Sequence, residues 1–442
     1  MSSSSPPAVP TRRIPLLDPP AAIGECAGCL RRTILALCLL LAGSAPAAEE
    51  VRIGMILPLT GAAASTGLEL RNAAELAAEI VNTPSGDFAL PLAAGKGLPH
   101  LGGAKIRLIF ADHQGNPQLG ASEAERLITQ EKVVALLGCY FSAVTATASQ
   151  VAERHGIPFL TGESSSSTLT RRGFQWFFRT TPHDELFVQN FFAFLKDVEK
   201  KKGIKIKTLA LLNENTLFGS ETTKLEEKLA EENGYKVAEK ILYPARSAQL
   251  TSEVQRIKAA AADVVMQSSY LGDAVLSIKT YKELGYAPSA LLANDAGFND
   301  SEFLKTVGKD AEYVLSREVW ALDLAERKPL IRKVNDLMEK RHGVSFNGNS
   351  ARDFTAVLVL AEAIDRAGST APEAIRKALR ETNLPADQLI MPWEGIRFDA
   401  TGQNDKGAGI IVQVQGGKYA TVWPFPLASR EIVWPMPDWS KR

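Results

Sequence analysis

The segment that most constrains the fold is residues 51–82, where a strand, a turn and a long helix are expected in succession. Val51–Pro58 is an almost continuous apolar run, typical of a strand buried on both faces. Leu59–Gly61 supplies a turn, and apolar residues then recur at helical spacing over Thr66–Asn82. A strand, a short turn and a helix form the opening unit of a doubly wound α/β domain, in which helices join parallel strands.

The residues before this unit have the composition of an export signal. Arg31-Arg32 precede the apolar run Thr33–Ala42, and small residues follow at Ala45–Ala47. A charged flank, an apolar region and a small-residue cleavage site are the three parts of a secretory signal peptide. We therefore expect residues 1–47 to be a signal peptide with a long leader, cleaved near Ala47, and the mature protein to reside in the periplasm. The paired arginines leave the twin-arginine route open, but we favour the ordinary secretory route.

Length and charge narrow the class of protein further. A chain of 442 residues exceeds one typical domain, so two lobes are expected. Basic and acidic residues number 50 each, and removing the leader leaves a slightly acidic balance. Such a balance gives no electrostatic basis for binding nucleic acid or an anionic membrane surface. No later apolar stretch reaches the ~20 residues that a membrane span needs.

The reactive residues do not form the patterns of common enzymes. Cys26, Cys29 and Cys38 lie in the leader, so the mature protein is expected to hold Cys139 as a single free thiol with no disulfide. There is no nucleophile elbow, phosphate loop or dinucleotide-binding turn. The five histidines are scattered without the spacing of metal ligands. We expect a protein without enzymatic activity, cofactor or metal; an enzyme using one of the clustered serines is the minor alternative.

Strand-like and helix-like segments alternate after residue 51, as in repeated βα units. The expected strands are Val51–Leu57, Lys105–Ala111, Val133–Leu137, Pro158–Thr161, Thr208–Leu212, Lys236–Leu242, Asp263–Gln267 and Ala290–Ala293. The expected helices include Gln118–Gln130, Val144–His155, Glu221–Asn233, Leu250–Ala261, Leu330–His342 and Ala351–Ala367.

Other segments are assigned by composition. Thr83–Gly103 is rich in Pro and Gly and is expected to be a loop. Gly409–Gln415 and Tyr419–Trp423 read as a hairpin, and the residues after 425 read as an extended tail on the surface.

Polar and aromatic residues follow two of the expected strands in the first half. Strand Val133–Leu137 runs into Tyr140, Phe141 and Ser142, and strand Pro158–Thr161 runs into Glu163, Ser164 and Ser165. The carboxyl ends of parallel strands line the ligand crevice of an open sheet. Hydroxyls and free N–H groups at helix starts can bind a carboxylate, although Ser142 could equally be an ordinary helix cap.

The second half offers a complementary edge. Tyr270 follows strand Asp263–Gln267, Asp295 follows strand Ala290–Ala293, and Phe218 lies after strand Thr208–Leu212. A carboxylate-binding edge facing a Tyr and Asp edge would suit a zwitterion. An Asx-turn or a helix cap is the alternative interpretation of Asp295.

The order of several short motifs resembles the type I periplasmic solute-binding proteins of ABC transporters, specifically the leucine/isoleucine/valine-binding family. The resemblance covers residues 51–425 and rests on Ile53-Gly54, Pro58–Gly61, Asp112 with Pro117, Gly138–Ser142, Ser164-Ser165 with Leu169-Thr170, Phe178–Thr181 and Phe218-Gly219. It implies two doubly wound lobes joined by three hinge crossings. Lobe one would take residues 51–180 and 318–400, lobe two residues 181–317 and 401–425, and a tail residues 426–442.

The resemblance also implies the ligand contacts. Ser142 matches the position that binds the ligand's carboxylate, and Asp295 matches the acidic residue that binds its ammonium, which is Glu in branched-chain binders. Phe218 corresponds to a family Tyr and lacks its hydroxyl. The full expected set of ligand-binding residues is Thr66, Tyr140, Phe141, Ser142, Glu163, Ser164, Ser165, Phe218, Tyr270 and Asp295.

The function implied by the resemblance is reversible capture of a small amphipathic ligand, an amino acid in the first instance, by a monomer. Closure of the lobes would enclose the ligand, and the protein would deliver it to the permease subunits of an ABC importer. The alternative is a ligand-sensing protein of the same fold that binds an amide or an aromatic acid in signalling or regulation.

Overall fold

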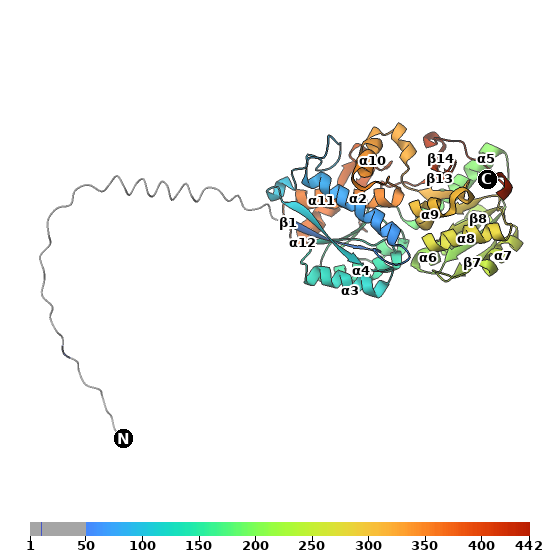
Figure 1. Ribbon diagram of the computed structural model, residues 1–442. Coiled ribbons are helices and arrows are strands. Elements are labelled where there is room, and N and C mark those ends of the chain that lie inside the picture. Colours follow the sequence, from blue (N-terminus) through green and yellow to red (C-terminus); the bar gives the residue numbers. More distant parts are fainter. Residues whose placement is uncertain (1–9, 11–49) are drawn as a thin grey trace, which may run out of the picture. The chain divides into compact units, whose positions relative to one another are not determined.

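The computed structural model describes Pro10 and residues 50–442 (Figure 1). The expected signal peptide and its cleavage site, Pro10 apart, lie outside the described residues. Strand β1 (Glu50–Leu57) turns into helix α2 (Ala64–Asn82), as the sequence predicts. The turn is tight because α2 contains Gly67, where an added Cβ atom would lie 2.0 Å from the carbonyl oxygen of Pro58.

The first sheet is fully parallel and has the strand order β2-β1-β3-β4-β5. The strands after β1 are β2 (Lys105–Asp112), β3 (Ala135–Gly138), β4 (Phe159–Thr161) and β5 (Phe177–Arg179). Besides α2, the helices that pack on it are α3 (Pro117–Thr129), α4 (Ser142–His155) and α11 (Gly348–Ala367). Helix α10 (Pro329–His342) packs against α2, and α12 (Pro372–Arg380) packs against α11. α3 packs beside α4, and α2 packs beside α11 (Figure 1).

The second sheet has the order β14-β13-β10-β9-β8-β6-β7 and is parallel except for the antiparallel strands β13 and β14 at one edge. Its strands are β6 (Thr208–Glu214), β7 (Lys236–Tyr243), β8 (Val264–Ser268), β9 (Leu291–Ala293), β10 (Leu315–Glu318), β13 (Ile410–Val414) and β14 (Tyr419–Trp423). Its helices are α5 (Asp184–Lys202), α6 (Leu217–Asn233), α7 (Thr251–Ala260), α8 (Leu271–Glu283) and α9 (Ser301–Val307).

Alternate side chains of the second sheet's strands enter two different cores. Leu209 and Leu211 of β6 pack with residues of α5 and α6. Ala210 and Leu212 pack with residues of α7 and α8. Since successive side chains of a strand point to opposite faces, helices cover both faces of this sheet, and the apolar run of β6 follows from this double burial.

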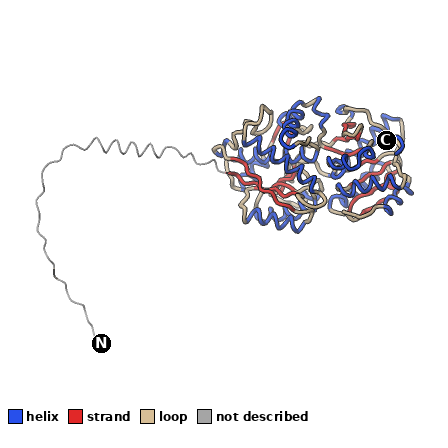
Figure 2. Tube along the Cα trace, viewed as in Figure 1, coloured by secondary structure: helices blue, strands red, loops and turns tan. Residues whose placement is uncertain are grey.

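We call the first sheet with its helices lobe one and the second sheet with its helices lobe two. Figure 2 shows the strands as two separate groups, each flanked by helices. The chain passes between the sheets three times: after β5, after β10 and before β13. A short antiparallel ladder, β11 (Asn383–Pro385) with β12 (Gly395–Arg397), precedes the third passage. The doubly wound, two-lobed architecture predicted from the sequence is confirmed.

The expected elements occur in the structure with bounds that shift by one to four residues. Helix α6 begins at Leu217 rather than at Glu221, so Phe218 lies in its first turn. Residues 83–103 form the expected loop, with one 3-10 turn at Pro99–Leu101. The short strands β5 and β10 were not among the strands expected from sequence. Unlike the equally short β4 and β9, they end in charged residues, Arg179 and Arg317-Glu318, which interrupt the apolar run typical of a buried strand.

The residues after 425 form an extended, mostly exposed or half-buried tail, as expected, but two of its side chains are anchored in lobe two. Ile432 and Met436 are buried and pack with the two cores of lobe two. The side-chain amide of Gln413 donates to the Val433 carbonyl at 2.9 Å and accepts from the Val433 N–H at 2.9 Å. These two hydrogen bonds hold the tail against β13. Along the described residues, no helix combines the length and apolar character that crossing a membrane requires.

Candidate functional site

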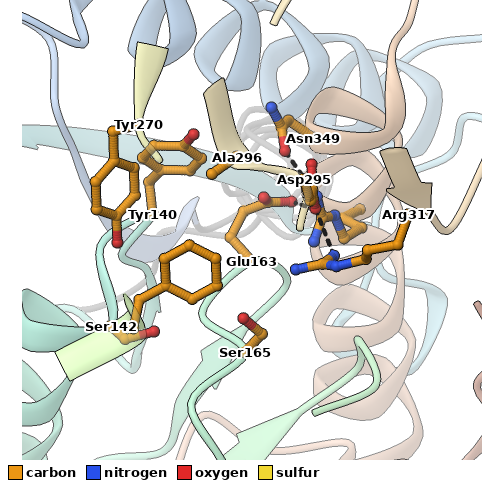
Figure 3. Close-up of a pocket in the computed structure, with 11 residues that line it drawn as sticks. Tyr140, Ser142, Glu163, Ser165, Tyr270, Asp295, Ala296, Arg317 and Asn349 are labelled. Carbon is orange, nitrogen blue, oxygen red and sulfur yellow. Dashed lines mark hydrogen bonds and ion pairs between the residues drawn. The ribbon is translucent and has the colours of Figure 1, made fainter. Parts of the chain in front are cut away.

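A small cavity lies where the carboxyl ends of the strands of both lobes meet. Figure 3 shows the side chains around it. Lobe one supplies residues that follow β3 and β4 and residues of α11. Lobe two supplies residues that follow β6, β8 and β9 and one residue within β10. The lining residues are Tyr140, Ser142, Glu163, Ser165, Phe218, Tyr270, Asp295, Ala296, Arg317, Asn349 and Arg352.

Most of the residues expected from sequence line this cavity, and three do not. Phe141 lies behind the wall, with its ring centroid 4.4 Å from that of Tyr270. Ser164 lies beneath the wall, where its hydroxyl donates to the Cys139 carbonyl at 2.5 Å and thereby holds the turn after β3. Thr66 donates its hydroxyl to Asp300, so it joins the lobes rather than lining the cavity.

The serine edge of the cavity is formed at the start of α4. Phe141 is the residue before the helix, and no side chain caps this end. Ser142 is the first helical residue, and its hydroxyl accepts only a long hydrogen bond, 3.4 Å, from the Ser166 N–H. Ser142 is therefore not a helix cap, contrary to the simpler interpretation of its sequence. Its hydroxyl faces the cavity together with Ser165 (Figure 3).

Aromatic rings form the wall next to the serine edge. The ring centroid of Tyr270 lies 5.6 Å from that of Tyr140 and 5.6 Å from that of Phe218. All three side chains line the cavity, and those of Tyr140 and Phe218 are more than nine-tenths buried. The Tyr140 hydroxyl is buried and has no hydrogen-bond partner among the described residues. This wall would contact the apolar part of a ligand, and the Tyr140 hydroxyl could donate to an oxygen of it.

The opposite end of the cavity is charged. Asp295 Oδ2 lies 2.5 Å from Arg317 Nη1 and 2.5 Å from Arg352 Nη2. Each of these three side chains is only 2% exposed. Asp295 therefore forms two buried ion pairs rather than an Asx-turn or a side-chain helix cap. Because Asp295 follows β9 and Arg352 lies on α11, one of these ion pairs joins the two lobes.

Neighbouring side chains fix the two guanidinium groups. Arg317 Nε donates to Asn294 at 2.8 Å, and Arg352 Nη2 donates to Asn349 at 2.7 Å. Glu163 Oε1 lies 3.0 Å from Arg352 Nε. Arg317, Arg352 and Asn349 were not among the residues expected from sequence to line the site. The available signal was an arginine inside the apolar helical pattern that begins at Ala351, which indicates a charged group on a buried face.

Burial and these contacts shift the pKa values of Asp295 and Glu163 in opposite directions. Burial disfavours the ionised form of Asp295, but the charges of Arg317 and Arg352 outweigh this effect and hold the pKa of Asp295 below its ordinary value. Burial raises the pKa of Glu163 well above its ordinary value, and the charge of Arg352 opposes that shift only in part. The cavity therefore contains two cations, one firmly ionised acid and one acid that tends to be neutral.

The backbone at Asp295 is strained. Asp295 and the next residue, Ala296, have φ values of 53° and 52°, a region that non-glycine residues seldom adopt. Such a conformation costs on the order of 1–3 kcal/mol per residue and persists only where surrounding contacts impose it. The two ion pairs of Asp295 supply those contacts, so this carboxylate has a fixed position.

The structure has two lobes and a cavity between them that is lined by hydroxyls and aromatic rings. This arrangement is typical of a two-lobed binding protein. A family model described as periplasmic binding protein matches residues 50–418. The chain belongs to this family, as its motifs suggested.

Relatives with similar sequences are named as leucine/isoleucine/valine-binding protein homologues. "Leu/Ile/Val-binding protein homolog 7" of Brucella suis is 30% identical over 404 residues, which cover 90% of this chain and 97% of that protein. "Leu/Ile/Val-binding protein homolog 8" of Brucella abortus is 28% identical over 388 residues, which cover 86% and 91%. The resemblance to the leucine/isoleucine/valine-binding proteins is thereby confirmed.

Solved structures of similar fold carry different ligands. A leucine-binding protein of Thermotoga maritima superposes with a TM-score of 0.72 at 21% identity, covering 84% of this chain and 97% of that one. A branched-chain amino acid binding protein of Streptococcus pneumoniae in complex with isoleucine has a TM-score of 0.70 at 19% identity, covering 88% and 100%. A solute-binding protein of R. palustris in complex with benzoate has a TM-score of 0.70 at 17% identity, covering 85% and 96%. At these identities the likeness concerns the fold.

Proposed function

We propose that this protein is the extracytoplasmic solute-binding component of an ABC importer. It captures a small amphipathic carboxylate between its lobes and delivers it to membrane permease subunits. The observation that carries the proposal is the cavity between the lobes, where Ser142 and Ser165 lie beside a wall of aromatic rings. Hydroxyls and the N–H groups of a helix start suit a carboxylate, and the rings suit an apolar body. Capture by lobe closure needs no cofactor and no covalent step.

The remaining elements of the proposal come from the sequence and from the family. The signal peptide would be removed near Ala47, and the mature protein would act in the periplasm as a monomer. Lobe one would comprise residues 51–180 and 318–400, and lobe two residues 181–317 and 401–425. Both an amino acid and a plain carboxylic acid are compatible with this proposal, since the relatives are named for the former and one structural neighbour holds benzoate.

Thermal-shift screening of the exported protein against amino acids, aliphatic acids and aromatic acids tests the capture step. We expect at least one small carboxylate to raise the midpoint of unfolding by several degrees, because a ligand that binds only the folded state stabilises it by mass action. Uptake of that compound by cells that lack the protein tests the transport step. A ligand whose uptake does not depend on the protein would favour the sensing alternative.

A further inference from the structure

The carboxylate that the family resemblance assigns to the ligand's ammonium is already paired within the chain. Asp295 Oδ2 has guanidinium nitrogens of Arg317 and Arg352 at 2.5 Å, and Oδ1 accepts from the Asn299 side chain at 2.9 Å. Both oxygens thus have donors. A ligand ammonium would have to approach Asp295 beside two fixed cations, in a region from which water is excluded.

No other acid that lines the cavity is better placed to bind an ammonium, because Glu163 is the only other lining acid. Glu163 lies 3.0 Å from the same Arg352, and burial favours its neutral form. Two donors among the lining residues have no hydrogen-bond partner in the described chain: the Asn349 amide nitrogen and the Tyr140 hydroxyl. The third such atom is an acceptor, Glu163 Oε1, and it already faces Arg352 Nε as an ion pair. A protonated Glu163 would add a third donor. Unpaired buried donors are costly, so this end of the cavity is suited to an oxygen acceptor.

We propose that the cavity selects carboxylic acids that carry no ammonium group, and that Arg317 and Arg352 are the residues that determine this specificity. The inference rests on the proposed function and deepens it by naming the ligand class. A ligand carboxylate bound at the serine edge lies in the field of two guanidinium groups, which face the fixed anion Asp295 and, 4.0 Å from Arg317 Nη2, the buried Asp184. Asp295 acts as a positioning residue, because it holds both guanidinium groups at the cavity wall instead of contacting the ligand's charge.

Matched pairs of ligands test the inference on the exported protein. The probes are propionate with alanine, 4-methylpentanoate with leucine, and 3-phenylpropanoate with phenylalanine, measured by isothermal titration calorimetry at pH 7. The members of each pair differ in the ammonium group. We expect the acid of the best-binding pair to bind at least tenfold more tightly than its amino acid. An amino acid that binds more tightly than its acid overturns the inference and leaves the proposed function standing. If no member of any pair binds, the capture of small carboxylates fails, and the inference fails with it.

Variants of the charged end separate the roles of the residues. Asp295→Asn removes the anion with little change of shape, so the acid should bind at least threefold more tightly. Arg352→Gln removes one cation and partly frees Asp295, so the ratio of acid affinity to amino-acid affinity should fall at least tenfold. Arg366→Gln is the matched control, because Arg366 lies on the same helix and pairs with Glu362 outside the cavity. If Asp295→Asn instead weakens amino-acid binding and leaves acid binding unchanged, Asp295 is the ammonium's partner and the inference is wrong. Should Arg352→Gln fail to fold, the Asp295 variant and the ligand pairs decide the question.

Discussion

Glu69 of α2 accepts a hydrogen bond from the hydroxyl of Ser301 on α9, so a lobe-one carboxylate is bound directly to lobe two. Beside this contact, Thr66 of α2 donates to Asp300, the residue that precedes α9. Asn347 donates to the second oxygen of Glu69 at 2.7 Å. Two carboxylates, Glu69 and Asp300, therefore lie close together where the lobes meet.

This arrangement predicts a pH-dependent contribution to stability. Burial first, and the charge of Asp300 second, raise the pKa of Glu69 to about 7. The folded state then holds a proton that the unfolded state releases above pH 4.5, so the contribution is full below about pH 4.5 and is lost as pH rises through 7. We expect wild type to lose more stability than Glu69→Gln between pH 5 and pH 7.5, by on the order of 1–3 kcal/mol. Urea unfolding at both pH values measures the difference.

The change in the free energy of unfolding with pH must be compared between wild type and Glu69→Gln, because other buried acids titrate in the same pH range. Burial raises the pKa of Asp353 to about 7 and that of Glu318 to about 8, and these shifts also remove stability as pH rises. An equal pH slope in wild type and Glu69→Gln would show that Glu69 is already ionised in the folded protein.

Ser142→Ala should weaken ligand binding more than it weakens the fold. The Ser142 hydroxyl has only a 3.4 Å hydrogen bond within the protein, so its loss should cost less than about 1 kcal/mol of stability. A hydrogen bond to a ligand carboxylate is worth roughly 1.5–3 kcal/mol, or a tenfold or greater loss of affinity. Calorimetric titration with the best carboxylate of the screen, together with thermal unfolding, measures both.

Ser164→Ala is the matched control for Ser142→Ala. Ser164 is equally buried, but its hydroxyl bonds to the Cys139 carbonyl at 2.5 Å and lies 2.6 Å from the Thr145 hydroxyl. We expect this variant to lose about 1–3 kcal/mol of stability, because buried groups lose their partner. Unchanged affinity in Ser142→Ala would remove the serine edge from the proposed site.

These two serines illustrate what the sequence could predict. Both follow strands whose carboxyl ends meet at one edge, so their neighbourhood could be inferred from the alternating pattern alone. Their different roles could not be inferred, because the sequence does not show whether a serine hydroxyl faces a cavity or a backbone carbonyl. Tyr270 and Asp295 were placed at the correct edge by the same reasoning.

The arginine pair could not be predicted in the same way. Arg317 lies in β10, a four-residue strand whose residues Leu315–Glu318 have no strand-like period. Arg352 lies on a helix, and its partner Asp295 is 57 positions away in the chain. A pattern of single residues shows which faces are buried but not which charges meet across two lobes.

Cys139 should be a single, protected thiol in the exported protein. Burial raises the pKa of this thiol far above its ordinary range, and only the thiolate reacts readily. We expect no alkylation by iodoacetamide in the native protein and one adduct after unfolding, measured by intact mass. Four adducts would show that the leader with its three cysteines is retained.

Ligand binding should reduce the radius of gyration in small-angle X-ray scattering. The contacts that join the lobes include the Asp295–Arg352 ion pair at the cavity and the exposed hydrogen bonds from Arg246 Nη2 to the carbonyls of Gln114 and Gly115, both 3.2 Å. A bound carboxylate adds contacts to both lobes and so favours the closed state. An unchanged radius at a saturating concentration of ligand would contradict closure as the capture mechanism.

Gly67→Ala should destabilise the protein through the first strand–turn–helix unit. An added Cβ atom would lie 2.0 Å from the Pro58 carbonyl oxygen, and this backbone atom cannot move aside without shifting β1 against α2. Overpacking of this kind typically costs 1–3 kcal/mol. Gly272→Ala on α8 is the control, because its added Cβ would have no heavy atom of the described chain within 4 Å apart from the neighbouring residues and the backbone of its own helix. Alanine has the higher helix propensity, so Gly272→Ala should leave stability unchanged or raise it by up to about 1 kcal/mol. Urea unfolding of both variants measures the two effects. Equal stability in the two variants would mean that the turn after β1 can open without cost, and that its tight packing does not position lobe one's sheet.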